Sequence, residues 1–126
     1  MPAPVMQKAI FAAEESGGSV TESSDRTEAM EGAHVIYAKS WSSTRHYGDT
    51  LADQKLREGL MDWCVDESWF ENAKEDCRFM HCLPVRRGVV VDDAILDGPR
   101  SIVIPEARNR MLAQMAVLHQ MLGGRQ

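Results

Sequence analysis

The chain has 126 residues and a formal net charge of −5, with 44% apolar and 26% charged residues. This negative balance disfavours nucleic acid or an anionic membrane as the main partner. The chain has no run of about 18 apolar residues, so we expect no transmembrane helix, and its start lacks the basic and apolar regions of a signal peptide. The length and composition suit one globular domain at most.

The cysteines are three in number, Cys64, Cys77 and Cys82. An odd number without a Cys-x-x-Cys spacing argues against a disulfide framework and against a structural zinc site. Reduced thiols in a cytoplasmic protein are the simplest interpretation. We expect neither a metal nor a cofactor.

The first elements are expected to be two helices and two strands. Gly17-Gly18 follows a one-sided apolar stripe of helical period, as glycines at a helix end do. Asp25 and Glu28 have the spacing of a capping pair. The predicted elements are a helix over residues 3–16, a strand over 19–22, a short helix that stops at Gly32, and a buried strand over 34–38.

The remaining elements continue the alternation of strands and helices, which favours an α/β fold with a mainly parallel sheet and flanking helices. A polar loop covers residues 39–50. The predicted elements after it are a helix over 51–61, a strand over 63–66, a helix over 67–73, a strand over 77–82, a brief pairing at 89–91, a short helix from Asp92-Asp93, a strand over 101–104, and a long helix opened by Pro105. The apolar face of that last helix is Met111, Leu112, Met115, Leu118, Met121 and Leu122.

Residues 77–88 have the sequence Cys-Arg-Phe-Met-His-Cys-Leu-Pro-Val-Arg-Arg-Gly. In this segment a strand is followed by two guanidinium groups, those of Arg86 and Arg87. Pro84 stops the strand because proline cannot donate to a ladder. Open α/β folds place their ligands at the carboxyl ends of strands, so this segment suits an anion-binding edge. An ordinary surface turn is the alternative.

His81-Cys82-Leu83-Pro84 resembles the signature of the ornithine branch of the aspartate/ornithine carbamoyltransferase family. The resemblance runs from about Ala33 to Leu122 and is closest to the N-acetylornithine enzymes. The motifs that carry it further are Val85-Arg86-Arg87, Asp93-Ala94, Leu96-Asp97-x-Pro99 and Asn109-Arg110.

In that family two α/β domains form the active site between them, and the first domain carries a Ser-x-Arg-Thr phosphate loop and a His-Pro-x-Gln motif. Neither motif occurs here. The resemblance therefore implies that residues 1–126 are part of the Rossmann-like, amino-acid-binding second domain, incomplete at its start, and that the carbamoyl-phosphate domain is absent. It also implies carbamoyl phosphate and N-acetylornithine as substrates, a trimeric full-length enzyme, and a role in arginine biosynthesis.

The resemblance assigns carbamoyl-phosphate contacts to Cys82, Leu83 and Arg110. The main-chain carbonyls at Cys82-Leu83 would face the carbamoyl amide and the attacking amine, and the Leu-Pro bond is generally cis. Cys82 would position the reacting groups and need not be a nucleophile. No residue is assigned as catalytic, because the family's catalytic His belongs to the first domain.

The resemblance assigns substrate contacts to Lys39, Trp41, Leu83 and Arg86. Ala38-Lys39-Ser40-Trp41 matches the acetylornithine branch, where this Lys meets the substrate's α-carboxylate. Ordinary ornithine enzymes tend to have Asp-x-Trp there, which holds a free α-amino group. Arg87 is expected to form structural salt bridges, and His81 to be a satisfied core histidine.

Two positions depart from the family. This chain has Arg108 where Glu is usual, and Val90 where some acetylornithine enzymes carry a Lys. N-succinylornithine and ornithine therefore stay open as acceptors. A stand-alone binding or regulatory module is a further alternative, while a nucleotide-binding domain lacks the Gly-x-Gly-x-x-Gly or Walker sequence it would need.

Overall fold

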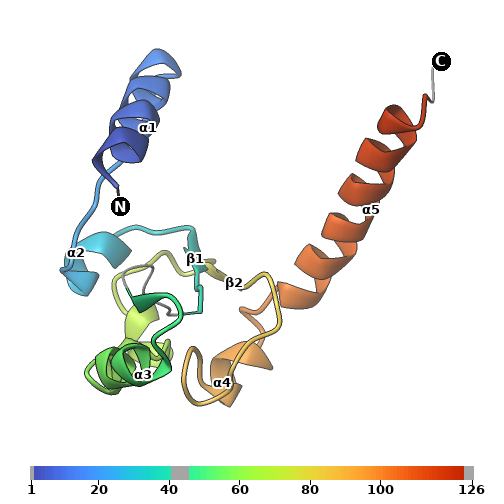
Figure 1. Ribbon diagram of the computed structural model, residues 1–126. Coiled ribbons are helices and arrows are strands. Elements are labelled where there is room, and N and C mark those ends of the chain that lie inside the picture. The colour runs from blue at the N-terminus through green and yellow to red at the C-terminus, as the bar shows by residue number, and fades with distance from the viewer. Residues whose placement is uncertain (1, 41–45, 124–126) are drawn as a thin grey trace.

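The computed structural model describes residues 2–40 and 46–123. In these residues two strands are separated and flanked by helices, and a small central body carries two projecting helices (Figure 1). The elements in order are α1 Ala3–Glu15, α2 Arg26–Met30, β1 Val35–Tyr37, α3 Thr50–Glu58, the 3-10 helices η2 Met61–Trp63 and η3 Glu67–Phe70, β2 Arg78–Met80, α4 Asp93–Leu96 and α5 Val103–Met121.

Strands β1 and β2 pair in parallel, with Ile36 opposite Phe79. On the other side of β2, Phe79 donates its N–H to Arg100 O and accepts from Ile102 N–H, which adds a single bridge at Ser101. A separate parallel bridge joins Val65 to Val91. The prediction of an α/β fold with parallel strands is confirmed.

The core lies around Phe79, which is fully buried in the middle of β2. Both strands show the alternation that one buried residue between more exposed neighbours produces. Helix α4 covers this centre with two of its four residues. The buried apolar cluster is Ile36, Val65, Phe70, Cys77, Phe79, Val91, Ile95, Leu96 and Val103.

The predicted cap at the start of α2 is confirmed. Asp25 accepts a hydrogen bond from the Glu28 N–H at 3.2 Å, so it caps α2 as expected. Asp49 caps α3 in the same way through the Ala52 N–H at 3.0 Å. Each cap satisfies a backbone donor that the first helical turn leaves without a partner.

Three predicted strands are wrong. Residues 19–22 form no strand and are exposed. Residues 63–66 contain the end of η2 and only one bridge, at Val65, and residues 101–104 contain one bridge, at Ser101. Helix α5 begins at Val103, two residues before Pro105, which is compatible with proline because the first N–H groups of a helix need no intrahelical partner.

The predicted helix over 67–73 is also shorter than expected, since only the 3-10 helix η3 forms there.

Helices α1 and α5 extend away from the body in different directions (Figure 1). No residue of α1 is buried, and α5 buries only Val103, at its start. The predicted apolar face of α5 is therefore exposed along its length, including Met115 at 59% and Leu118 at 56%. Within residues 2–40 and 46–123, none of the helices is long and apolar enough to cross a membrane.

Candidate functional site

The carboxyl ends of β1 and β2 bring two of the predicted site residues together. Lys39 lies two residues after β1 and Cys82 two residues after β2. Because the strands are parallel, both ends meet at one edge of the sheet, and the Lys39 ammonium donates to Cys82 Sγ at 3.3 Å. This contact is the main reason that the pKa of the Cys82 thiol lies below its usual range.

The chain turns sharply immediately after Cys82. Leu83 has φ = 47°, a left-handed backbone conformation that residues other than glycine rarely adopt. The Leu83–Pro84 peptide bond is cis. The Leu83 N–H donates to His81 Nδ1 at 2.9 Å, which holds the turn. The cis bond that the resemblance implied is therefore present.

Arg110 reaches this turn from α5. Its guanidinium donates to the Cys82 carbonyl oxygen at 2.6 Å. Arg110 and Leu83 also line one cavity of about 770 Å³, together with other residues of the loop after Cys82, including Arg87, and with residues from the end of α4, including Asp97, to the start of α5. The structure thus brings Lys39, Cys82, Leu83 and Arg110 to one place.

The other two predicted substrate residues are not part of this cluster. Arg86 is exposed, and its side chain makes no hydrogen bond or ion pair with the residues that the structure describes. Trp41 lies outside the described residues.

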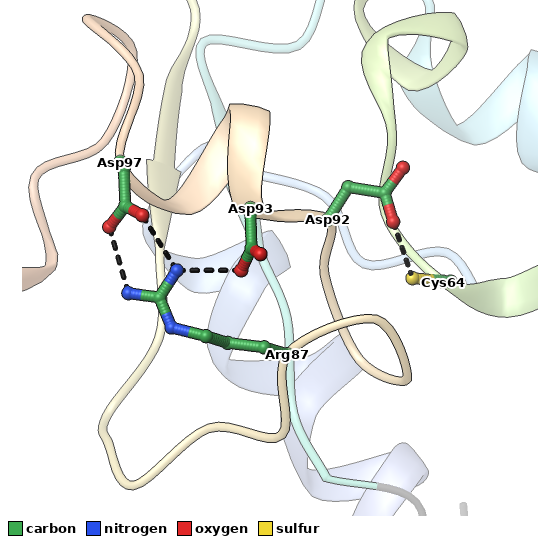
Figure 2. A network of polar contacts seen from close by, with 5 residues as sticks. All are labelled: Cys64, Arg87, Asp92, Asp93 and Asp97. Atoms are coloured by element: carbon green, nitrogen blue, oxygen red, sulfur yellow. Dashed lines mark hydrogen bonds and ion pairs between the residues drawn. The ribbon is translucent and has the colours of Figure 1, made fainter.

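Arg87 forms structural ion pairs, as expected. Its guanidinium contacts Asp93 Oδ1 at 2.6 Å and both carboxylate oxygens of Asp97, at 2.6 and 2.9 Å (Figure 2). This pairing lowers the pKa of Asp97. Asp92 points the other way, to the Cys64 thiol at 3.6 Å (Figure 2). Arg87 therefore fastens the loop after Pro84 to α4.

His81 is buried, as expected, although only one of its ring nitrogens is satisfied. Nδ1 accepts the Leu83 N–H, so in the neutral ring Nε2 carries the hydrogen. Nε2 is buried and has no hydrogen-bond partner within the described part of the chain. Burial is the main cause that lowers the pKa of His81, and the nearby Lys39 cation adds to it.

Glu106 is a polar residue of this edge that the sequence reasoning missed. Its two carboxylate oxygens accept hydrogen bonds from the Tyr37 hydroxyl at 2.8 Å and from the His81 N–H at 3.1 Å. The carboxylate raises the pKa of Tyr37 to about 12. In the sequence, an acidic residue in a first helical turn indicates only a favourable interaction with the helix dipole. Its spacing of four residues from Arg110 was the available signal, because such residues share a helix face.

Comparison with known proteins identifies the family to which this architecture belongs. Residues 2–121 match the family described as aspartate/ornithine carbamoyltransferase, Asp/Orn binding domain. The chain is 38% identical over 109 residues to the N-acetylornithine carbamoyltransferase of Xanthomonas campestris pv. campestris, covering 86% of this chain and 32% of that protein. It is 42% identical over 107 residues to the ornithine carbamoyltransferase of Rhizorhabdus wittichii, covering 85% of this chain and 33% of that protein.

Solved structures agree with these sequence matches. The crystal structure of N-acetyl-L-ornithine transcarbamylase superposes with a TM-score of 0.83 at 36% identity, covering 94% of this chain and 36% of that one. The ornithine carbamoyltransferase from Pyrococcus furiosus superposes with a TM-score of 0.84 at 37% identity, covering 98% of this chain and 38% of that one. The chain spans about a third of the length of the curated relatives it matches. It belongs to the aspartate/ornithine carbamoyltransferase family, whose Asp/Orn-binding domain it matches.

Proposed function

We propose that this chain supplies the amino-acid-binding half of a cytoplasmic carbamoyltransferase of arginine biosynthesis, which transfers the carbamoyl group of carbamoyl phosphate to the side-chain amine of N-acetylornithine. The observation that carries the proposal is the convergence of Lys39, Cys82 and Arg110 at the carboxyl edge of β1 and β2. The phosphate-binding half comes from a separate domain, so the chain is inactive by itself.

In this reaction the neutral amine attacks the carbamoyl carbon, the bond from that carbon to the phosphate oxygen breaks, and inorganic phosphate leaves while the nitrogen loses a proton. The protein's task is mainly to orient the reactants and to stabilise the developing charge. The Cys82 carbonyl accepts one hydrogen bond from Arg110 and keeps a second lone pair for an N–H of a reactant. Arg110 keeps further donors for the carbamoyl phosphate anion.

Lys39 is the residue that favours an acylated acceptor. Acylation removes the positive charge of the α-amino group, so an acidic partner for that group would be left unpaired, while a cation can still bind the α-carboxylate. Lys39 is exposed at the strand end, where its ammonium can reach such a ligand. Relatives support this choice: one structure is described as N-acetyl-L-ornithine transcarbamylase complexed with carbamyl phosphate and N-succinyl-L-norvaline, and another as acetylornithine transcarbamylase complexed with acetylcitrulline.

Ornithine and N-succinylornithine are the alternative acceptors, because curated relatives of similar identity carry both the ornithine and the N-acetylornithine names. Val90, which stands where some acetylornithine enzymes carry a Lys, is fully buried here. It therefore offers no polar group to an acyl substituent.

The test is a transcarbamylase assay on the chain mixed with the separately produced first domain of a close relative. We expect a citrulline-type product from carbamoyl phosphate and N-acetylornithine, less from ornithine or N-succinylornithine, and none from either part alone. Lys39→Ala and Arg110→Ala should abolish it, while Arg86→Ala shows whether that exposed residue takes part. Absence of product with every acceptor, from a chain shown to be folded, would contradict the proposal.

A second candidate is a stand-alone module that binds an amino acid without catalysis. The observation that favours it is the contact between Lys39 and Cys82 within one chain. Calorimetric binding of N-acetylornithine by the chain alone, with no turnover in any mixture, would favour this candidate.

We further propose that the full enzyme is a homotrimer. The exposed apolar side chains of α5 support an assembly in which another domain or subunit covers them.

A further inference from the structure

Helix α5 holds the end of β2 through two residues one turn apart. Glu106 accepts a hydrogen bond from the His81 N–H at 3.1 Å, and Arg110 donates to the Cys82 carbonyl at 2.6 Å. Residues four apart lie on the same face of a helix. An acceptor and a donor on one helix face therefore bind two successive residues of the strand end.

The second oxygen of Glu106 extends this hold to the other strand. It accepts the Tyr37 hydroxyl hydrogen at 2.8 Å, and Tyr37 is the last residue of β1, two residues before Lys39. One half-buried carboxylate thus ties the end of β1 to the end of β2. The same two strand ends present Lys39 and Cys82 to each other at 3.3 Å.

Two hydrogen-bond donors, the Tyr37 hydroxyl and the Lys39 ammonium, lie at this edge near Cys82. The Tyr37 hydroxyl donates its single hydrogen to Glu106, and the Lys39 ammonium donates to Cys82 Sγ. Both Lys39 and Tyr37 lower the pKa of Cys82, and Lys39 is the larger cause. The acidity of the Cys82 thiol then depends on how closely Lys39 is held. The titratable and charged groups around Cys82 are Tyr37 at the end of β1, Lys39 just after β1, His81 just after β2, and Glu106 and Arg110 from α5.

We propose that Glu106 is a positioning residue that holds the ends of β1 and β2 so that Lys39 and Cys82 meet at the substrate edge. Glu106 acts through its reach to two donors rather than through its charge. The proposal rests on the proposed function only in taking Lys39 and Cys82 as substrate-side groups. The contact between them can be measured without turnover.

The measurement is the rate at which iodoacetamide alkylates Cys82 between pH 6 and 10, followed by peptide mass spectrometry on the full chain. Only the thiolate reacts, so losing the Lys39 contact should slow alkylation at neutral pH by about tenfold for each unit of pKa. Lys39→Ala in the otherwise unchanged chain sets the size of this Lys39 effect. Cys64 is an internal reference, because its burial raises its pKa to about 11 and it touches none of these residues.

Two substitutions distinguish the effect of the length of the Glu106 side chain from the effect of its charge. Glu106→Gln keeps the length, so its carbonyl can accept the His81 N–H while its amide faces the Tyr37 oxygen. Glu106→Asp keeps the charge at the start of α5 but is one methylene too short to span both donors. We expect Lys39→Ala to slow Cys82 alkylation about as much in the Gln variant as in the unchanged chain, and to have almost no effect in the Asp variant.

Each variant by itself tests whether Glu106 positions Lys39 and Cys82, provided that its circular dichroism spectrum matches that of the unchanged chain. A full Lys39 effect in Glu106→Asp, or a lost one in Glu106→Gln, would overturn the proposal. Failure of the transcarbamylase assay alone would leave it standing, because alkylation requires neither carbamoyl phosphate nor the first domain.

Discussion

At the scale of single residues, the site depends on a cation and a sulfur placed by two strand ends. Lys39 is exposed and Cys82 is half-buried, so the pair is open to a ligand from the solvent side. A substrate carboxylate at Lys39 would compete with the thiolate for the same ammonium group. Lys39 is therefore the residue whose charge most directly tests the preference for an acylated acceptor.

Reversing that charge should change the acceptor. Lys39→Asp puts a carboxylate opposite the substrate carboxylate, and a like-charge contact of this kind costs several kcal/mol. We expect transfer to N-acetylornithine in the reconstituted assay to fall at least about a hundredfold, which corresponds to about 2.7 kcal/mol, while ornithine is affected less because its free amine can pair with the new Asp. Lys74→Asp, at an exposed lysine away from this edge, is the control and should leave both rates unchanged.

His81 makes the fold sensitive to pH. Its pKa in the folded chain is below the ordinary 6.5, mainly because the ring is buried. Between the pKa of His81 in the folded chain and the ordinary 6.5, the unfolded chain binds more protons than the folded chain. The His81 contribution to stability is therefore complete above about pH 6.5 and is lost as the pH falls through the pKa of the folded chain. Protonation would also remove the Nδ1 acceptor from the Leu83 N–H.

We expect the melting temperature of the chain to fall between pH 7.5 and pH 5.5, by about 4–8 °C for each kcal/mol lost. His81→Asn keeps an acceptor for Leu83 without a titrating ring and should show a smaller fall. The exposed histidines are present in both proteins, so their effects cancel. An equal fall in the two proteins would show that His81 is not the group that titrates.

At the scale of elements, the parallel pair β1–β2 is the structural centre, and α5 joins it to the site. Phe79 in β2 is fully buried and lies opposite Ile36 of β1, while its own N–H and carbonyl bond to Arg100 and Ile102 in the segment before α5. Met115 on α5 is 59% exposed. The two side chains are both large and apolar, yet they should contribute very differently to stability.

Phe79→Ala should lower the free energy of unfolding by about 3–5 kcal/mol, the usual cost of removing a buried aromatic ring. That is a large part of the roughly 5–15 kcal/mol of a typical domain. Met115→Ala should change it by no more than about 0.5 kcal/mol, as exposed substitutions do. Urea unfolding followed by circular dichroism measures both, and equal losses would mean that the core is not centred on β2.

The sequence predicted the elements whose signal is local or strongly patterned. The apolar runs around Ile36 and Phe79 gave both paired strands, and Asp25 gave the start of α2. Short apolar runs such as residues 101–104 were misassigned, because periodicity over four residues does not distinguish a strand from the start of a helix.

A motif marked Lys39, Cys82, Leu83 and Arg110, and these residues do converge; their roles in binding stay predictions. The contacts of Glu106 could not be predicted, because they join three elements that are far apart in the sequence.

At the scale of the whole molecule, the chain exposes much apolar surface for its size. Five large apolar residues of α5 are between 50% and 59% exposed, namely Met111, Leu112, Met115, Val117 and Leu118. Exposed patches of this kind mark surfaces that pack against another protein or domain. The chain spans about a third of the length of its relatives, which fits such a surface.

We expect the chain alone to self-associate in a concentration-dependent way in size-exclusion chromatography with light scattering. Leu112→Lys combined with Met115→Lys should increase the monomer fraction, because both substitutions place charge on the exposed face of α5. Alkylation of Cys82 should be unchanged in this variant, which serves as the control for a folded site. A monomeric starting chain, or an unaltered distribution in the variant, would argue against an interaction surface on α5.

Binding of the amino acid at the carboxyl edge of β1 and β2 can be tested directly by nuclear magnetic resonance titration of the ¹⁵N-labelled chain with N-acetylornithine. We expect the amide signals of Lys39, Cys82, Leu83 and Arg110 to shift together with one dissociation constant, and Lys39→Ala to remove the shifts. The signals of α1, which has no buried residue and does not line the cavity beside Arg110, should stay in place. Shifts confined to other parts of the chain, or shifts that survive Lys39→Ala, would contradict the claim that this strand edge binds the amino acid.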